Sequence, residues 1–342
     1  VGWLAFAIAA VTYLLTIEPT ASFWDCGEFI SSAFKLEVGH PPGAPFFMMT
    51  ARLFTLFASD TTQVAAMVNS MSAICSAFTI LFLFWTITHL ARKILLKEGE
   101  EMSVTKIIAI LGAGLVGALA YAFSDTFWFS AVEGEVYAYS SLFTAVVFWV
   151  MLKWEDAADK PGSDRWIILI AYLMGLSIGV HLLNLLAIPA IVLVYYFKKY
   201  TPTTKGVILA IVASGAILVA VLYGLIPGFV KVASWFELLF VNSLGMAFNT
   251  GLIIYLIVVT AVLVWAIYET QAGKNVVRMK IAFLAALTLL GIPFVGDNVI
   301  LGILLVIGGG LFLFLYKKEI SRRWLNTIIL CATMMLVGYA SY

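Results

Sequence analysis

Charged residues are scarce in this chain. Asp, Glu, Lys and Arg make up 11% of its 342 residues, against about 25% in a soluble globular domain. Hydrophobic residues make up 63%, and the mean hydropathy is +1.05. The sequence therefore predicts an integral membrane protein that contacts the lipid bilayer along most of its length. A basic patch interleaved with aromatic residues is also lacking, so nothing indicates nucleic-acid binding.

Cysteine is rare as well. Cys26, Cys75 and Cys331 are far apart in the sequence, so they predict neither a disulfide framework nor a metal-ligand cluster. A signal peptide cannot be argued, because the chain opens inside an apolar run. It also ends inside one, as a fragment of a longer protein would. We therefore treat 1–342 as one transmembrane domain and expect a soluble C-terminal outer domain beyond it.

Long apolar runs account for most of the chain. About 20 apolar residues cross the hydrocarbon core of a bilayer. Two runs, 167–197 and 281–316, do not fit a single crossing, and the second is interrupted at 293–298. A last run covers 324–338. The runs that fit one crossing are 1–17, 64–90, 107–123, 136–152, 207–226 and 252–268.

The distribution of positive charge predicts how these runs are threaded. Five clusters between the runs hold 17 of the 20 Lys and Arg residues, and the positive-inside rule places all five in the cytoplasm. Each awkward run must then cross twice, turning near 181–184 and at 293–298. We expect an all-α polytopic fold of about 11 transmembrane helices, with a cytoplasmic N-terminus. The clusters are Arg92, Lys93, Lys97 and Lys106; Lys153, Lys160 and Arg165; Lys198, Lys199 and Lys205; Lys274, Arg278 and Lys280; Lys317, Lys318, Arg322 and Arg323.

Acidic residues dominate the predicted outer face. Only Lys35, Arg52 and Lys231 are basic there, and the cytoplasmic loops are too short for a soluble domain. We therefore expect any chemistry on the outer side or within the membrane. The outer acids are Glu18, Asp25, Glu28, Glu37, Asp60, Asp125, Glu133, Glu135, Glu237 and Asp297.

The first outer loop, 18–61, is the densest polar segment. It predicts two lateral interfacial helices, 24–38 and 45–58, separated by a rigid Gly-His-Pro-Pro-Gly break at 39–43. Asp25 and Glu28 share one face of the first turn. They are either acids favoured there by the helix dipole or a general base with a supporting acid. His40, held between a glycine and two prolines opposite them, favours the second interpretation.

These residues carry a family resemblance. Asp25-Cys26-Gly27-Glu28 followed by Gly39-His40-Pro41-Pro42-Gly43 resembles the motifs of the GT-C superfamily of membrane glycosyltransferases. The likeness is greatest to the multi-span protein O-mannosyltransferases of bacteria and animals, and it covers roughly the first 200 residues. It implies a polyprenyl-phosphate donor carrying mannose or another hexose. It also implies a Ser or Thr acceptor on a secreted or periplasmic protein, an active site facing the periplasm or lumen, and no cofactor.

The resemblance also implies roles for residues. Asp25 is the expected catalytic base and Glu28 its support, because hydroxyl attack on an anomeric carbon needs a base. His40 and Arg52 are expected to bind the donor phosphate, which suits the fork of Arg. No metal is predicted, because many related enzymes with monophosphate donors need none, although the acids near Asp25 leave one open.

Four further residues are expected to support the site or the acceptor. In the second outer loop, acids are either functional at the membrane edge or solvated in a hydrated loop. In the 167–197 turn, a polar pair either reaches the same cavity or satisfies helix ends, and the second interpretation is slightly favoured. The four are Glu133, Glu135, His181 and Asn184.

Two rival functions differ in class. A transporter or lipid flippase would explain the short hairpins and the break at 293–298, but we find no paired halves and no charge at the span centres. A non-catalytic scaffold would leave Asp25, Glu28 and the His-Pro-Pro break without a purpose.

Overall fold

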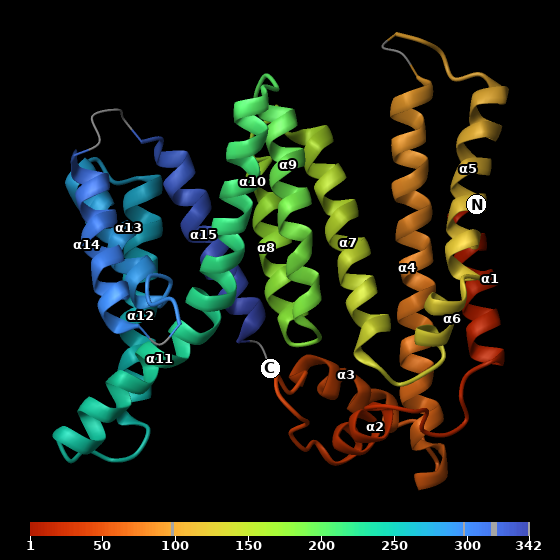
Figure 1. Ribbon diagram of the computed structural model, residues 1–342, viewed down its shortest axis with the longest axis horizontal. Helices are drawn as coiled ribbons and strands as arrows, with labels where there is room; N and C mark the ends of the chain where they lie inside the picture. The colour runs from red at the N-terminus through yellow and green to blue at the C-terminus, as the bar shows by residue number, and fades with distance from the viewer. Residues whose placement is uncertain (97–98, 297, 316–319, 341–342) are drawn as a thin grey trace. The chain divides into compact units, whose positions relative to one another are not determined.

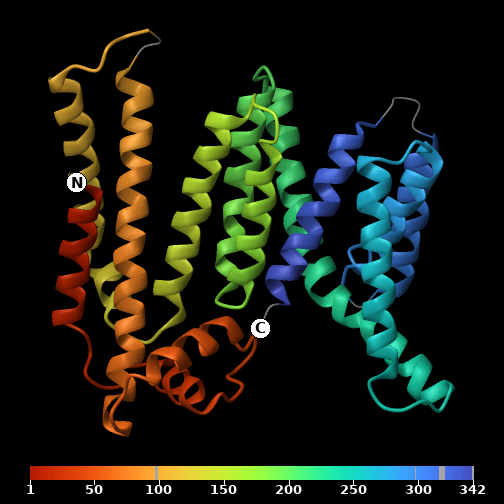
Figure 2. The ribbon, with the colours of Figure 1, turned by 180° about the vertical axis from the view of Figure 1, so that it is seen from behind.

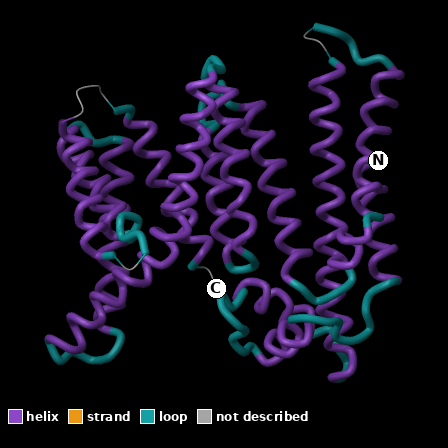
Figure 3. Tube along the Cα trace, in the orientation of Figure 1, coloured by secondary structure: helices purple, strands orange, loops and turns teal. Residues whose placement is uncertain are grey.

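The computed structural model describes residues 1–96, 99–296, 298–315 and 320–340. These residues form helices joined by loops and contain no strand (Figure 3), which confirms the all-α prediction. Four of the charged residues named above, Lys97, Asp297, Lys317 and Lys318, lie outside the described residues.

Membrane-spanning potential is spread along the chain. Six helical segments are long and apolar enough to cross a bilayer, and two shorter helices are also apolar. The protein is therefore a helical membrane protein, while the number of eleven crossings and their orientation stay predictions. The six segments are Thr61–Leu95, Val104–Ala122, Val136–Ala157, Leu182–Lys199, Thr204–Ser243 and Thr250–Gln271; the shorter two are Gly2–Leu15 and Val299–Leu315.

The helices divide into two compact units. The first holds Val1–Trp166, Leu173–Ala187 and the end of the chain from Gly338. The second holds Ile167–Tyr172 and Ile188–Val337. All the candidate site residues named above belong to the first unit.

Helix α4 (Val64–Leu95) is the centre of the first unit. It packs against α1 (Gly2–Leu15), α5 (Val104–Ala122) and α7 (Val136–Ala157), as Figures 1 and 2 show. Buried small residues such as Ala73 and Ala77 let the neighbouring helices approach one of its faces closely. Because α4 is packed against three other helices, the elements that contact its N-terminal end are held in a fixed position.

Two short helices, α2 (Cys26–Lys35) and α3 (Pro45–Thr55), lie across the N-terminal end of α4 in both ribbon views (Figures 1 and 2). They confirm the pair of lateral helices, each shorter than expected. The apolar face of α2, including Phe29 and Ile30, is buried against α3 and α4. Because its apolar face is buried, α2 has one orientation about its axis, and this determines where its polar face points.

Two predicted helix interruptions can be compared with the structure. α8 (Asp164–Ile178) ends just before the predicted turn, and helical turns resume in η2 (Leu182–Ala187) and α9 (Ile188–Lys199). α13 (Val276–Leu289) and α14 (Val299–Leu315) pack together around the second predicted break. Both interruptions therefore fall where the sequence placed them.

The expected run 207–226 is wrong in its length. The chain stays helical from Thr204 to Ser243 through α10 (Thr204–Val219), η3 (Ala220–Leu225), α11 (Ile226–Glu237) and η4 (Leu238–Ser243). Pro227 does not end it, because the π-helical turns of η3 precede α11 and Pro227 occupies its first turn. Pro227 lacks the amide that would donate to the preceding turn, and the carbonyl of Tyr223, four residues earlier, accepts instead from the amide of Gly296 at 3.0 Å. α12 (Thr250–Gln271) and α15 (Arg322–Tyr339) complete the second unit.

Candidate functional site

The first loop (residues 18–61) brings three polar side chains together. Ligand-type atoms of Asp25, Glu28 and His40 all lie within 4.8 Å of one another. Asp25 stands at the N-cap of α2, Glu28 in its first turn, and His40 in the break before α3. We call these three residues the acid–His cluster.

The carboxylate of Asp25 is not used to cap its own helix. Asp25 occupies the N-cap position, yet its side chain accepts no capping hydrogen bond, and only its main-chain carbonyl accepts one, from the amide of Phe29 at 2.9 Å. The carboxylate of Asp25 therefore makes no capping hydrogen bond, although its position at the N-terminal end of α2 is one that the helix dipole favours for an acid. Its exposed carboxylate is left facing solvent.

Glu28 holds the His-Pro-Pro break against α2. Its Oε1 accepts from the amide of His40 at 2.5 Å, and its Oε2 lies 3.1 Å from the ring Nδ1 of His40. The backbone bond is the largest cause of the lowered pKa of Glu28, and the ring contact adds to it. Gly39 permits this approach, because a Cβ there would lie 3.1 Å from Glu28 Oε1 and 3.1 Å from Met48 Cε.

Two acids of the second outer loop are buried beside the cluster. Glu133 and Glu135 are 6% and 5% exposed, so they are not solvated acids of a hydrated loop. The pKa of Glu135 is raised to about 7, mainly by burial, and the nearby charge of Asp25 contributes to this rise. Burial also raises the pKa of Glu133. We call Glu133 and Glu135 the acid pair.

The acid pair is held from several directions. Glu135 is the N-cap of α7 and accepts from the amide of Val136 at 3.0 Å. The side chains of Ser22 and Cys26 hydrogen-bond to Glu133. Sequence analysis overlooked Ser22 and Cys26, which offered no signal beyond their nearness to Asp25 in the chain.

Gly134 separates the two acids because no side chain fits there. A Cβ would lie 2.9 Å from Asn69 Oδ1, 3.0 Å from Val68 and 3.1 Å from Ile30. Asn69 of α4 in turn donates through Nδ2 to the carbonyls of Glu18, at 2.6 Å, and Thr20, at 3.1 Å. One buried amide therefore joins the start of the first loop to α4 and lies beside Gly134 in the loop before α7.

Arg52 is engaged away from the cluster. Its guanidinium donates to the carbonyl of Phe34 at 2.7 Å and to the hydroxyl of Thr55 at 3.1 Å, and it lies 5.3 Å from the centre of the Phe34 ring. These contacts tie α3 to the last turn of α2. Arg52 pairs with no carboxylate among the described residues.

His181 and Asn184 lie in the turn between α8 and α9. The ring Nδ1 of His181 accepts from the amide of Leu183 at 3.1 Å, which is the helix-end role considered for this pair. Its ring also lies 5.5 Å from that of Tyr137. Asn184 is buried and its Oδ1 accepts from Thr144 at 2.8 Å. Both residues therefore approach α7, the helix that Glu135 caps.

The same turn meets the first loop through main-chain atoms. The carbonyl of Gly179 accepts from the amides of Phe46, at 2.7 Å, and Phe47, at 3.2 Å. These are two of the amides at the start of α3 that have no partner within the helix. The C-terminal end of α8 thus satisfies the N-terminal end of α3.

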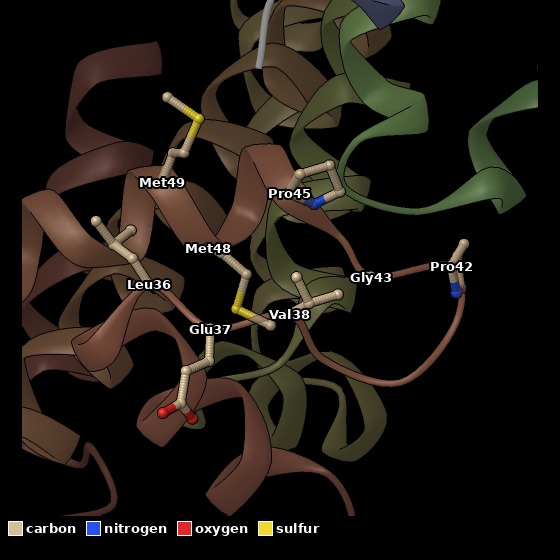
Figure 4. A pocket seen from close by; sticks show the side chains of 8 residues that line it. All are labelled: Leu36, Glu37, Val38, Pro42, Gly43, Pro45, Met48 and Met49. Atoms are coloured by element: carbon tan, nitrogen blue, oxygen red, sulfur yellow. The ribbon is translucent and has the colours of Figure 1, made fainter. Parts of the chain in front are cut away.

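An open pocket lies on the His40 side of the first loop (Figure 4). Its volume is about 280 Å³, and Figure 4 shows the Glu37 carboxylate directed away from the other lining side chains. An apolar group is the ligand that such a wall accepts best. The lining residues are Leu36, Glu37, Val38, Pro42, Gly43, Pro45, Met48 and Met49.

Metal binding by the acid–His cluster is chemically open. Two carboxylates and an imidazole are ligands that divalent cations accept, and their donor atoms are within reach of one another. In the structure, however, both Glu28 oxygens are already in contact with His40. The absence of a metal requirement remains a prediction.

The fold and the cluster define a polytopic helical membrane protein with a candidate site on lateral helices. Comparison with known families is more specific. The sequence model of the family described as Protein O-mannosyl-transferase TMEM260 N-terminal domain matches residues 25–204, more than half of the chain. The chain belongs to this family. The matched region begins at Asp25 and includes the whole acid–His cluster and the acid pair.

Two relatives carry the same description. The mouse protein named Protein O-mannosyl-transferase TMEM260 is 28% identical over 174 residues, which cover 51% of this chain and 22% of that protein. Protein O-mannosyl-transferase tmem260 of Dictyostelium discoideum is 25% identical over 206 residues, which cover 57% of this chain and 22% of that protein. The similarity thus spans about a fifth of the length of each relative. No solved structure matches the chain.

Proposed function

We propose that this chain carries the catalytic loop of a glycosyltransferase that moves a mannose-like hexose from a polyprenyl-phosphate donor to a Ser or Thr hydroxyl of a protein. The single observation that carries the proposal is the acid–His cluster, in which an uncapped Asp25 carboxylate lies beside the Glu28–His40 contact. Family membership supports the reaction class, because both relatives are named protein O-mannosyl-transferases.

Asp25 is the proposed base. The acceptor oxygen attacks the anomeric carbon, the bond from that carbon to the phosphate oxygen breaks, and its electron pair leaves with the phosphate. The acceptor proton passes to the Asp25 carboxylate, whose exposure allows an acceptor side chain to reach it. A general base of this kind contributes about 10²–10⁴-fold.

Glu28 is proposed as a positioning residue that acts through His40. With Nδ1 of the protonated ring donating to Glu28 Oε2, the Nε2–H of the same ring is left for an oxygen of the leaving phosphate. Charge-assisted donors suit a phosphate oxygen. The second Glu28 oxygen holds the His40 amide, so the position of the ring depends on Glu28.

The role proposed for Arg52 is less direct than the phosphate binding that the sequence predicted. Its guanidinium already binds the end of α2, so we propose that it supports the loop and contributes positive potential near the phosphate. We further propose that the acceptor binds in a region formed by Glu133, Glu135, His181 and Asn184. The active site is proposed to face the periplasm or lumen.

Sugar transfer by the full chain in lipid nanodiscs tests the proposal. A polyprenyl-phosphate mannose donor is incubated with a Ser/Thr peptide, and mannosylated peptide is measured by mass spectrometry. Asp25→Asn is expected to lose at least about a hundredfold in rate while it still binds the donor. Asp60→Asn is the matched control, because Asp60 lies in the same loop but caps η1 (Thr61–Gln63) through Thr62.

Two results would contradict the assignment. A fully active Asp25→Asn enzyme would remove the base. Movement of the lipid across the bilayer without sugar transfer in any variant would favour the transporter or flippase alternative.

A further inference from the structure

Helix α4 carries a buried polar stripe that the proposed reaction does not use. Asn69, Ser72 and Ser76 are spaced three and four residues apart, so they share one face of the helix. All three are 0% exposed. Within the described part of the chain, Asn69 Oδ1 and the hydroxyls of Ser72 and Ser76 have no hydrogen-bond partner. We call these residues the α4 stripe.

Other hydroxyls on the same helix are satisfied locally. Ser70 donates to the carbonyl of Ala66 at 2.7 Å, and Thr79 donates to that of Cys75 at 3.0 Å. The α4 stripe therefore differs from its neighbours, although all of them have the same backbone within reach. Buried polar groups without partners are costly, and most of those in proteins are bonded to protein or to ordered water.

The stripe begins at the acid pair. Asn69 Oδ1 points at Gly134, the residue between Glu133 and Glu135, and would lie 2.9 Å from a Cβ at that position. Ser76 is seven residues further along α4, which is about 10 Å at 1.5 Å per residue. The three residues thus form a row along α4 that starts beside Gly134, the residue between the two buried acids, and runs into the helix bundle.

We propose that the α4 stripe is a binding site for ordered water, which solvates the acid pair from the side of the bundle. Water fits the chemistry of the row, because an amide oxygen accepts and each hydroxyl both donates and accepts. A buried water typically makes about three hydrogen bonds, so bridging neighbouring members of the row would satisfy all three. The bound water lowers the cost of charge on Glu133 and Glu135 and gives them a route for proton exchange.

Radiolytic labelling in H₂¹⁸O tests this site with water itself as the probe. Hydroxyl radicals formed from ordered internal water oxidise adjacent sulfur side chains. Cys75 lies three residues after Ser72, so the two side chains are neighbours on α4, and Cys75 is 8% exposed. It should take up ¹⁸O severalfold faster than Met279, which is 2% exposed on α13. Labelling no faster than that of Met279 would overturn the proposal.

Serine replacements give a second and independent test. If Ser76 binds water, Ser76→Ala loses that bond, so its unfolding midpoint should lie at or below that of Ser70→Ala, which loses the bond to Ala66, and labelling of Cys75 should drop severalfold. If Ser76 is an unsatisfied hydroxyl, its removal relieves a cost, and the midpoint should rise above the same control. Ser70→Ala corrects for the higher helix propensity of alanine. Neither measurement involves a sugar donor, so the outcome is separate from that of the proposed function.

Discussion

Glu135 makes the stability of the protein depend on pH in a direction opposite to that of most carboxylates. Burial raises the pKa of its carboxyl from 4.5 to about 7 in the folded protein. Between these values the folded state holds a proton that the unfolded state has released. Stability is therefore greatest below pH 4.5, as far as this group is concerned, and is lost as the pH rises through 7.

The magnitude follows from the size of the shift. Each pKa unit corresponds to 1.36 kcal/mol, so a rise from 4.5 to about 7 is worth about 3 kcal/mol. Glu135→Gln keeps the shape and an acceptor for the Val136 amide but cannot ionise. We expect Glu135→Gln to be about 3 kcal/mol more stable than the parent above pH 8 and equal to it near pH 4.

The assay is equilibrium unfolding of the full chain in bicelles from pH 3 to 9, followed by circular dichroism. Glu28→Gln is the control with the opposite sign, because the pKa of Glu28 is lowered by its bonds from His40. That variant should lose stability relative to the parent above pH 4.5 and approach it as the pH falls through the folded pKa of Glu28. A Glu135→Gln curve parallel to that of the parent from pH 4 to 8 would refute the reasoning.

Three further perturbations test the packing, the pocket and the topology. Gly134→Ala should destabilise the fold by about 1–3 kcal/mol, because its Cβ would lie 2.9 Å from Asn69 Oδ1; Gly215→Ala, with nothing within 4 Å, should not destabilise it in the same unfolding assay. Met49→Trp should fill the open pocket, which we propose takes up the apolar chain of the donor, and should raise the donor KM severalfold in the transfer assay. Leu56→Trp on the exposed end of the same loop should leave the donor KM unchanged. Ser243→Cys should react with an impermeant maleimide from the periplasmic or lumenal side, and labelling only from the cytoplasm would contradict the predicted threading.

Local patterns predicted the parts of the fold that depend on neighbouring residues. The lateral helices followed from the break at 39–43, and the interruption between α13 and α14 followed from Pro293 and Gly296. The run 207–226 ended too early, because here the helix continues past Pro227 after the π-helical turns of η3. Hydropathy alone does not distinguish the two cases.

The candidate site likewise has one part that the sequence predicted and one part that it did not. Asp25, Glu28 and His40 lie within sixteen positions of one another, and their clustering was predicted. The burial of the acid pair was not, because it depends on Asn69 of α4, 51 positions from the carbonyl of Glu18 that it binds. Contacts of that separation leave no periodic signal. The spacing of Asn69, Ser72 and Ser76 was visible in the sequence as a polar face within an apolar run.

The junction of Gly179 with Phe46 and Phe47 is made only of main-chain atoms. Its two donors and its acceptor are present whatever side chains occupy positions 46 and 47, with proline the exception because it lacks the amide hydrogen. Sequence drift at these two positions therefore alters packing but keeps the anchor. Homologues with other residues at these positions would keep the two hydrogen bonds that fix the start of α3. The break at 39–43, which carries His40, would then keep its position relative to the end of α8 while the side chains around it change.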